Sequence, residues 1–142
     1  MEKIIKELYD VILARKDESE DNSYTGYLFR EGIDKILKKV GEESSEVIIA
    51  AKSLEAAGAA NPEIPGYPET SVAANPGIPG NFEKPAVAAN LAALRDDFVG
   101  EVCDLLYHLL VLLVERGVPL EDIEAVLAAR AAKTGNLKQT KR

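Results

Sequence analysis

Apolar residues recur every three or four positions along most of the chain, which is the spacing of one face of an α-helix. The pattern predicts helices over residues 2–16, 26–57, 86–116 and 119–132. We find no run in which apolar and polar residues alternate with the period of two that a half-buried strand shows. The sequence therefore predicts an all-α fold, a bundle of about four helices.

Glycine and proline mark the boundary between the last two predicted helices. Gly117 supplies a C-terminal stop, and Pro119 suits the first turn of the helix that follows. In that last helix we expect an inward-facing apolar side made of Ile123, Val126 and Leu127.

The second predicted helix, residues 26–57, is preceded by a polar, charge-rich connection over residues 16–25. It contains Gly32 and Gly41, each of which weakens a helix by about 1 kcal/mol relative to alanine. We therefore expect a packing or close-approach reason for each glycine.

Residues 58–86 interrupt the helical pattern. They hold six of the seven prolines, and the sequence Asn-Pro-Glu-Ile-Pro-Gly at 61–66 returns as Asn-Pro-Gly-Ile-Pro-Gly at 75–80. This proline density excludes the interior of a helix or a sheet and predicts an extended insert, with a partner-docking arm as the alternative. We expect one domain, residues 1–142, that carries this insert and a basic tail at 133–142.

The composition limits the possible partners. The chain has 142 residues, 46% of them hydrophobic, and a formal net charge of −7. That charge argues against binding to nucleic acid or an anionic membrane without help, since both favour a basic face. The N-terminus has mixed charges and no secretory signal, so we expect a cytoplasmic protein.

The apolar run Leu105–Val114 is too short to cross a bilayer, which needs about 20 apolar residues. Its apolar residues spread around most of the helix, so we expect a homodimer that buries them. Cys103 precedes this run as the single cysteine, which permits no intrachain disulfide, and we expect a buried, inert thiol.

Acidic residues form two clusters at helical spacing. Glu42, Glu43 and Glu46 lie within an arc of roughly 100° on one predicted helix, and Glu101 and Asp104 share a face of another. Antiparallel packing of the two helices would bring these acids together, where they would repel unless a hard divalent cation lay between them. The pattern therefore predicts Mg²⁺ and a phosphorylated substrate.

Basic residues near the first cluster leave two interpretations open. Lys35 and Lys39 lie on the same arc and can contact phosphates, but with Lys38 they can equally neutralise a solvated acidic face. His108 lies four residues after Asp104 and is more often a satisfied core or interface histidine than a ligand. With a single histidine, a di-iron site of the ferritin type is disfavoured.

Three stretches of the chain resemble the phosphoribosyl-ATP pyrophosphohydrolases, which catalyse the second step of histidine biosynthesis. They are Ser-Tyr-Thr-Gly-Tyr-Leu at 23–28, Lys-Ile-Leu-Lys-Lys-Val-Gly-Glu-Glu-Ser-Ser-Glu at 35–46, and Gly-Glu-Val-Cys-Asp-Leu-Leu-Tyr-His-Leu-Leu at 100–110. The resemblance covers most of residues 1–57 and 91–135. It implies membership of the all-α nucleotide pyrophosphohydrolases, which include MazG-like proteins and dimeric dUTPases.

The resemblance also implies an activity and a set of site residues. The expected reaction is Mg²⁺-dependent hydrolysis of the α–β phosphoanhydride of phosphoribosyl-ATP, by a homodimer, to phosphoribosyl-AMP and pyrophosphate. The implied Mg²⁺ ligands are Glu43, Glu46, Glu101 and Asp104, the implied catalytic acids Glu42, Glu43 and Glu46, and the implied phosphate contacts Lys35, Lys39 and Arg130.

The chain departs from that family in its long proline-rich insert. It also lacks the cysteines that a fused, zinc-dependent cyclohydrolase domain would need, so we expect a monofunctional protein. Two alternatives stay open: a pyrophosphohydrolase of the same superfamily that acts on another nucleotide, and a non-catalytic helical dimer with a docking arm.

Overall fold

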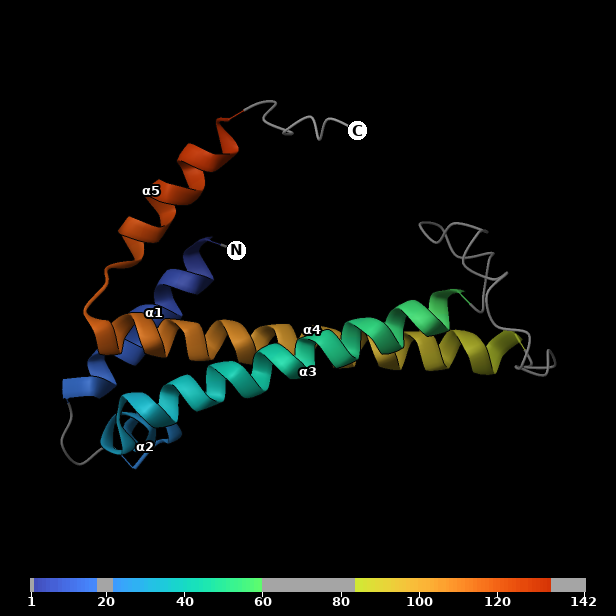
Figure 1. Ribbon diagram of the computed structural model, residues 1–142, viewed down its shortest axis with the longest axis horizontal. Coiled ribbons are helices and arrows are strands. Elements are labelled where there is room, and N and C mark those ends of the chain that lie inside the picture. The colour runs from blue at the N-terminus through green and yellow to red at the C-terminus, as the bar shows by residue number, and fades with distance from the viewer. Residues whose placement is uncertain (1, 18–21, 60–83, 134–142) are drawn as a thin grey trace, which may run out of the picture. The chain divides into compact units, whose positions relative to one another are not determined.

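A computed structural model describes residues 2–17, 22–59 and 84–133 (Figure 1). They form helices, and no strand occurs in these ranges, so the predicted all-α fold is confirmed. The helices are α1 (Glu2–Asp17), α2 (Tyr24–Glu31), α3 (Ile33–Ala59), α4 (Lys84–Arg116) and α5 (Leu120–Ala131). Most of the repeat-containing insert, 60–83, and the tail from 134 onward lie outside the described residues, so the predictions made for them stay predictions.

The expected single helix over residues 26–57 is wrong, because Gly32 divides it into α2 and α3. Gly32 has φ +83° and ψ −173°, a conformation that side chains disfavour and that no α-helix contains. Its N–H donates to the carbonyl of Leu28, and its own carbonyl accepts from Ile36 N–H, so hydrogen bonds hold both sides of the break. At the start of α2, Ser23 Oγ accepts from Gly26 N–H as an N-cap.

The described residues fall into two units, and the first contains residues up to 36 and from 109 onward. Its core includes the fully buried side chains of Ile12, Leu28 and Val111. Two side chains of α1 contact the end of α4 and the residues after it: Lys16 donates to the carbonyl of Val114, and Tyr9 donates to that of Val118.

The end of α4 follows the prediction made from glycine and proline. Gly117 has φ +65°, and the following Val118 N–H donates to the carbonyl of Leu113, a bond typical of a helix C-terminus. Pro119 then caps α5. The inward orientation expected for Val126 and Leu127 is wrong in this chain, where they are 50% and 55% exposed. Helical periodicity shows that a face is apolar, but it does not show that the same chain covers it.

The second unit contains residues 37–108, which is most of α3 and most of α4. Within it the two helices run side by side in opposite directions, as Figure 1 shows. Their sequences bury Ala50 and also two polar residues, Glu43 and His108. Cys103 is exposed, so the expected buried thiol is wrong. An apolar run that surrounds a helix does not tell which of its residues face a neighbour.

None of the described helices contains a stretch long and apolar enough to span a membrane.

Candidate metal site

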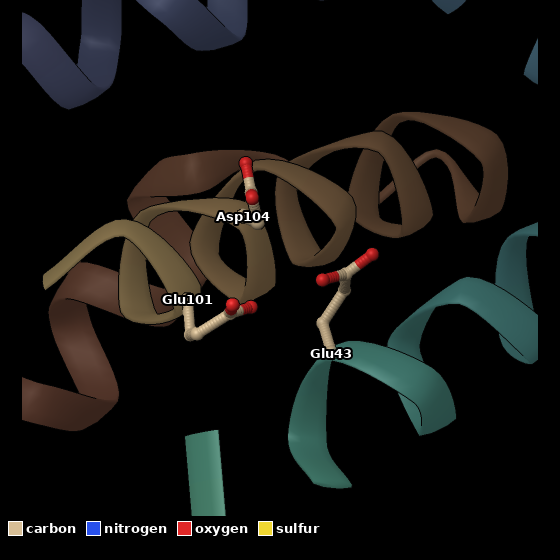
Figure 2. Close-up of side chains that lie close together, drawn as sticks. All are labelled: Glu43, Glu101 and Asp104. Carbon is tan, nitrogen blue, oxygen red and sulfur yellow. The ribbon is translucent and has the colours of Figure 1, made fainter. Parts of the chain in front are cut away.

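Three carboxylates from the two predicted acidic clusters lie close together in the second unit. Glu43 belongs to α3, and Glu101 and Asp104 belong to α4. One oxygen from each lies within 4.8 Å of the others, and Figure 2 shows Glu43 and Glu101 turned into the space between the helices. The predicted convergence of acids from two helices is therefore present in the fold.

The three carboxylates differ in their exposure to solvent. Glu43 is 4% exposed, Glu101 is half-buried, and Asp104 is exposed. All of their donor atoms are oxygens, which hard cations such as Mg²⁺ prefer, and Mg²⁺ usually keeps several waters beside one or two carboxylates. The chemistry of this donor set fits Mg²⁺, and the exposed Asp104 is accessible to water.

Lys39 is the cation nearest to the buried acid. Its Nζ lies 2.6 Å from Glu43 Oε1 and 3.2 Å from Glu42 Oε2, so it bridges two acids one turn further along α3. The hydrogen bond from Lys39 holds the pKa of Glu43 below its ordinary value, although burial opposes this effect. Glu43 is thus an ionised carboxylate in spite of its burial.

The other two acids of α3 behave in opposite ways. Hydrogen bonds from Lys38 and Lys39 lower the pKa of Glu42. The side-chain hydrogen bond with Glu43 raises the pKa of the exposed Glu46, and the negative charges of Glu43 and Glu101 add to the effect. Glu46 therefore lies beside the three clustered carboxylates, while its role as a fourth metal ligand stays a prediction.

His108 adjoins the same cluster from the inner side of α4. It is buried, with Nδ1 2.8 Å from the carbonyl oxygen of Asp104 and 3.7 Å from Glu43 Oε1. Because a carbonyl can only accept, Nδ1 carries the proton and donates it. The ring is also in edge contact with Tyr107. Its four-residue step from Asp104 indicated the same helix face, but sequence reasoning interpreted His108 as a satisfied core or interface histidine and not as a ligand.

The other two predicted phosphate contacts belong to the first unit. Lys35 has its Nζ 5.7 Å from the centre of the Tyr27 ring, and Arg130 is exposed in the last turn of α5. The phosphate-binding roles of Lys35, Lys39 and Arg130 stay predictions.

Comparisons with known proteins agree with the motifs. The sequence model of the family described as phosphoribosyl-ATP pyrophosphohydrolase matches residues 5–131. The phosphoribosyl-ATP pyrophosphatase of Clostridium novyi is 42% identical over 139 residues, which cover 98% of this chain and 91% of that protein. That of Pelotomaculum thermopropionicum is 42% identical over 130 residues, which cover 92% and 93% of the two chains.

The chain is also similar to part of a larger protein. It is 40% identical over 121 residues to the histidine biosynthesis bifunctional protein HisIE of Thermoanaerobacter pseudethanolicus, covering 85% of this chain and 38% of that protein. The resemblance inferred from the two acidic motifs is confirmed by these matches along nearly the whole sequence: the chain belongs to the phosphoribosyl-ATP pyrophosphohydrolase family.

Proposed function

We propose that this protein hydrolyses the α–β phosphoanhydride of phosphoribosyl-ATP in an Mg²⁺-dependent reaction that releases pyrophosphate, as a step of histidine biosynthesis. The observation that carries the proposal is the convergence of Glu43, Glu101 and Asp104 from two helices in a chain of this family. Three carboxylates so close together favour a cation between them, and hydrolysis of a phosphoanhydride is assisted by the same cation.

Glu43, Glu101 and Asp104 would hold the Mg²⁺, with Glu46 at its edge. When bound, Mg²⁺ supplies neutralisation of the charge that develops on the phosphates and acidification of a coordinated water. The buried Glu43 would serve as the fixed anchor because packing restricts its side chain.

Glu46 is suited to accept a proton from the attacking water. It is exposed, and its neighbour Glu43 raises its pKa, which makes it a stronger base than an ordinary surface carboxylate. Glu42 has a supporting role, since it holds Lys39 beside the site. Lys39, Lys35 and Arg130 would contact the phosphates of the substrate.

We also propose that the protein acts as a cytoplasmic homodimer. Several large apolar side chains are well exposed in the single chain, among them Ile48 and Ile49 of α3 at 64% and 65%. A second copy of the chain is the partner that would cover them.

The test is a substrate panel. The purified protein should release pyrophosphate from phosphoribosyl-ATP with Mg²⁺ and should lose this activity when EDTA is added. Ordinary nucleoside triphosphates, assayed in parallel, should be hydrolysed far more slowly. Preference for a nucleoside triphosphate would favour a related pyrophosphohydrolase of other specificity, and no hydrolysis of any of them would favour a non-catalytic helical protein.

A further inference from the structure

One cation already occupies part of the candidate metal site. Lys39 Nζ lies 2.6 Å from Oε1 of Glu43, which is the buried member of the three clustered carboxylates. Its second partner is Glu42, with Nζ 3.2 Å from Oε2. Glu42 is outside the three clustered acids, so Lys39 joins a candidate ligand to an acid that lies beside the site.

This arrangement explains how the protein keeps Glu43 buried and charged before a metal binds. Burying a carboxylate without a partner is costly, and the negative charges of nearby acids add repulsion. Lys39 offsets this cost, because its ammonium lies 2.6 Å from Glu43 Oε1. The lysine therefore supplies the positive charge that the carboxylates need when no dication is present.

The same contact conflicts with metal binding. A dication on Glu43 and an ammonium 2.6 Å from the same carboxylate would repel each other strongly in a partly buried site. Lys39 has a flexible four-carbon stem and a second partner in Glu42, so it can leave Glu43 and stay beside the site.

We propose that Lys39 is the internal counter-ion of the metal-free site, that a divalent cation displaces it from Glu43, and that the displaced ammonium, held by Glu42, becomes available to a phosphate of the substrate. This inference rests on the proposed function, because it uses the same metal site. It adds that metal binding releases Lys39 from Glu43 and so makes its ammonium available to a phosphate.

The chain offers a matched control in the adjacent residue. Lys38 pairs with Glu42 at 3.2 Å, as Lys39 does, but it is not paired with Glu43. The side chain of Lys38 is 66% exposed, whereas that of Lys39 is 24% exposed. Replacing either lysine by methionine removes one positive charge from α3, but only Lys39→Met removes the charge that competes with the metal.

The experiment is a titration with metal alone, with no substrate present. Free Mn²⁺ is followed by electron paramagnetic resonance, and Mg²⁺ binding is followed by calorimetry. Lys39→Met should bind Mn²⁺ at least about tenfold more tightly than the wild type, because one opposing unit charge at this range shifts an ionic equilibrium by that order. Lys38→Met, and Lys39→Arg, which keeps the charge, should stay within about threefold of the wild type.

A different ranking would overturn the inference. If Lys39→Met binds Mn²⁺ no more tightly than Lys38→Met, Lys39 does not compete with the metal, although phosphoribosyl-ATP hydrolysis by the wild type would leave the proposed function standing. If the wild type binds no Mn²⁺, the metal site and this inference both fail.

A measurement on the wild type covers the case in which Lys39→Met does not fold. The side-chain ε-methylene signals of Lys39 should shift on saturation with Mg²⁺, by more than those of Lys38 measured in the same spectrum. Unchanged Lys39 signals in protein saturated with Mg²⁺ would contradict displacement.

Discussion

Glu43 is a buried carboxylate whose charge is influenced by residues on both helices of the second unit. Lys39 stabilises its ionised form, and Nδ1 of His108 lies 3.7 Å from the same oxygen. Glu46 shares a hydrogen bond with it and, as a result, has a raised pKa. The buried Glu43 thus has two neighbours with different roles: Lys39 balances its charge, and Glu46 becomes more basic because of it.

The raised pKa of Glu46 makes a prediction for the metal-free protein. The pKa of Glu46 in the folded protein lies above its ordinary value of 4.5. As the pH rises between these two values, the carboxyl of Glu46 loses its proton in the unfolded chain before it does so in the folded protein. The free energy of unfolding therefore falls over this pH interval. Glu46→Gln should therefore raise the Tm in EDTA at neutral pH, and the gain should shrink as the pH approaches 4.5. Thermal scans across pH check this.

The control for that prediction is Glu124→Gln, which removes an exposed acid of α5 from outside the cluster. It should not reproduce the pH-dependent gain. A Glu46→Gln protein that is less stable than the wild type at neutral pH without metal would contradict the repulsion inferred for this pair.

The residues of the site were partly predictable. The spacing of Glu42, Glu43 and Glu46 identified one acidic face, and the three-residue step from Glu101 to Asp104 identified another, because helix geometry alone determines which side chains share a face. The contact of Lys39 with Glu43 could not be predicted, since it depends on the rotamer of a long side chain. Nor could the contact of His108 with Glu43, which depends on how closely two helices approach.

Gly32 and Gly41 show why the same residue type has different effects in different elements. Both lie in a stretch that the hydrophobic pattern describes as one helix, so the pattern could not tell a break from a tolerated glycine. The structure distinguishes them by backbone conformation: Gly32 has φ +83°, whereas Gly41 lies within the continuous helix α3. A Cβ added at either position would meet no atom within 4 Å.

These two glycines make a paired prediction. Gly32→Ala should lower the free energy of unfolding by about 1–3 kcal/mol, because alanine is strained at positive φ. Gly41→Ala should raise it by about 0.5–1 kcal/mol, because alanine loses less conformational entropy in a helix. Urea denaturation of both variants measures the difference, and equal effects would contradict the break at Gly32.

Lys16, a residue of α1, caps the C-terminus of α4. This contact leads to a second prediction about a helix. Its Nζ donates to the carbonyls of Val114 and Glu115 and forms an ion pair with the Glu115 side chain at 3.1 Å. The negative end of the helix dipole, at the C-terminal carbonyls, favours such a cation. Lys16→Met should therefore cost about 1 kcal/mol of stability in urea denaturation.

The control is Lys3→Met, which breaks the exposed ion pair of Lys3 with Glu7. An exposed pair of this kind contributes about 0–0.5 kcal/mol, so the variant should be nearly as stable as the wild type. Equal losses in the two variants would show that Lys16 does not cap α4.

At the scale of the whole molecule, the all-α class and the family could be predicted, but the solvent exposure of several residues could not. Periodicity and the motifs gave an all-α member of the phosphoribosyl-ATP pyrophosphohydrolase family, and both are confirmed. The expected burial of Cys103, Val126 and Leu127 is wrong for the single chain. Burial depends on which neighbour covers a face, and a pattern along one helix contains no information about that neighbour.

The exposed apolar residues lead to a prediction about the oligomeric state of the protein. Sedimentation equilibrium should give twice the 15.4 kDa mass of the chain over a range of protein concentrations. Replacing Ile48 and Ile49 by serine should shift the protein toward the monomer, because these residues are among the most exposed large apolar side chains described. A monomeric wild type at high concentration would contradict the proposed dimer.

We propose that the clustered carboxylates hold the Mg²⁺ that hydrolysis of phosphoribosyl-ATP requires. The most direct measurement is pyrophosphate release as a function of Mg²⁺ concentration, for the wild type, Asp104→Asn and the control Asp96→Asn, an exposed acid of α4 outside the cluster. Asp104→Asn should lose at least about 100-fold in activity and require more Mg²⁺, while Asp96→Asn should match the wild type. Wild-type activity and Mg²⁺ dependence in a folded Asp104→Asn protein would contradict the account.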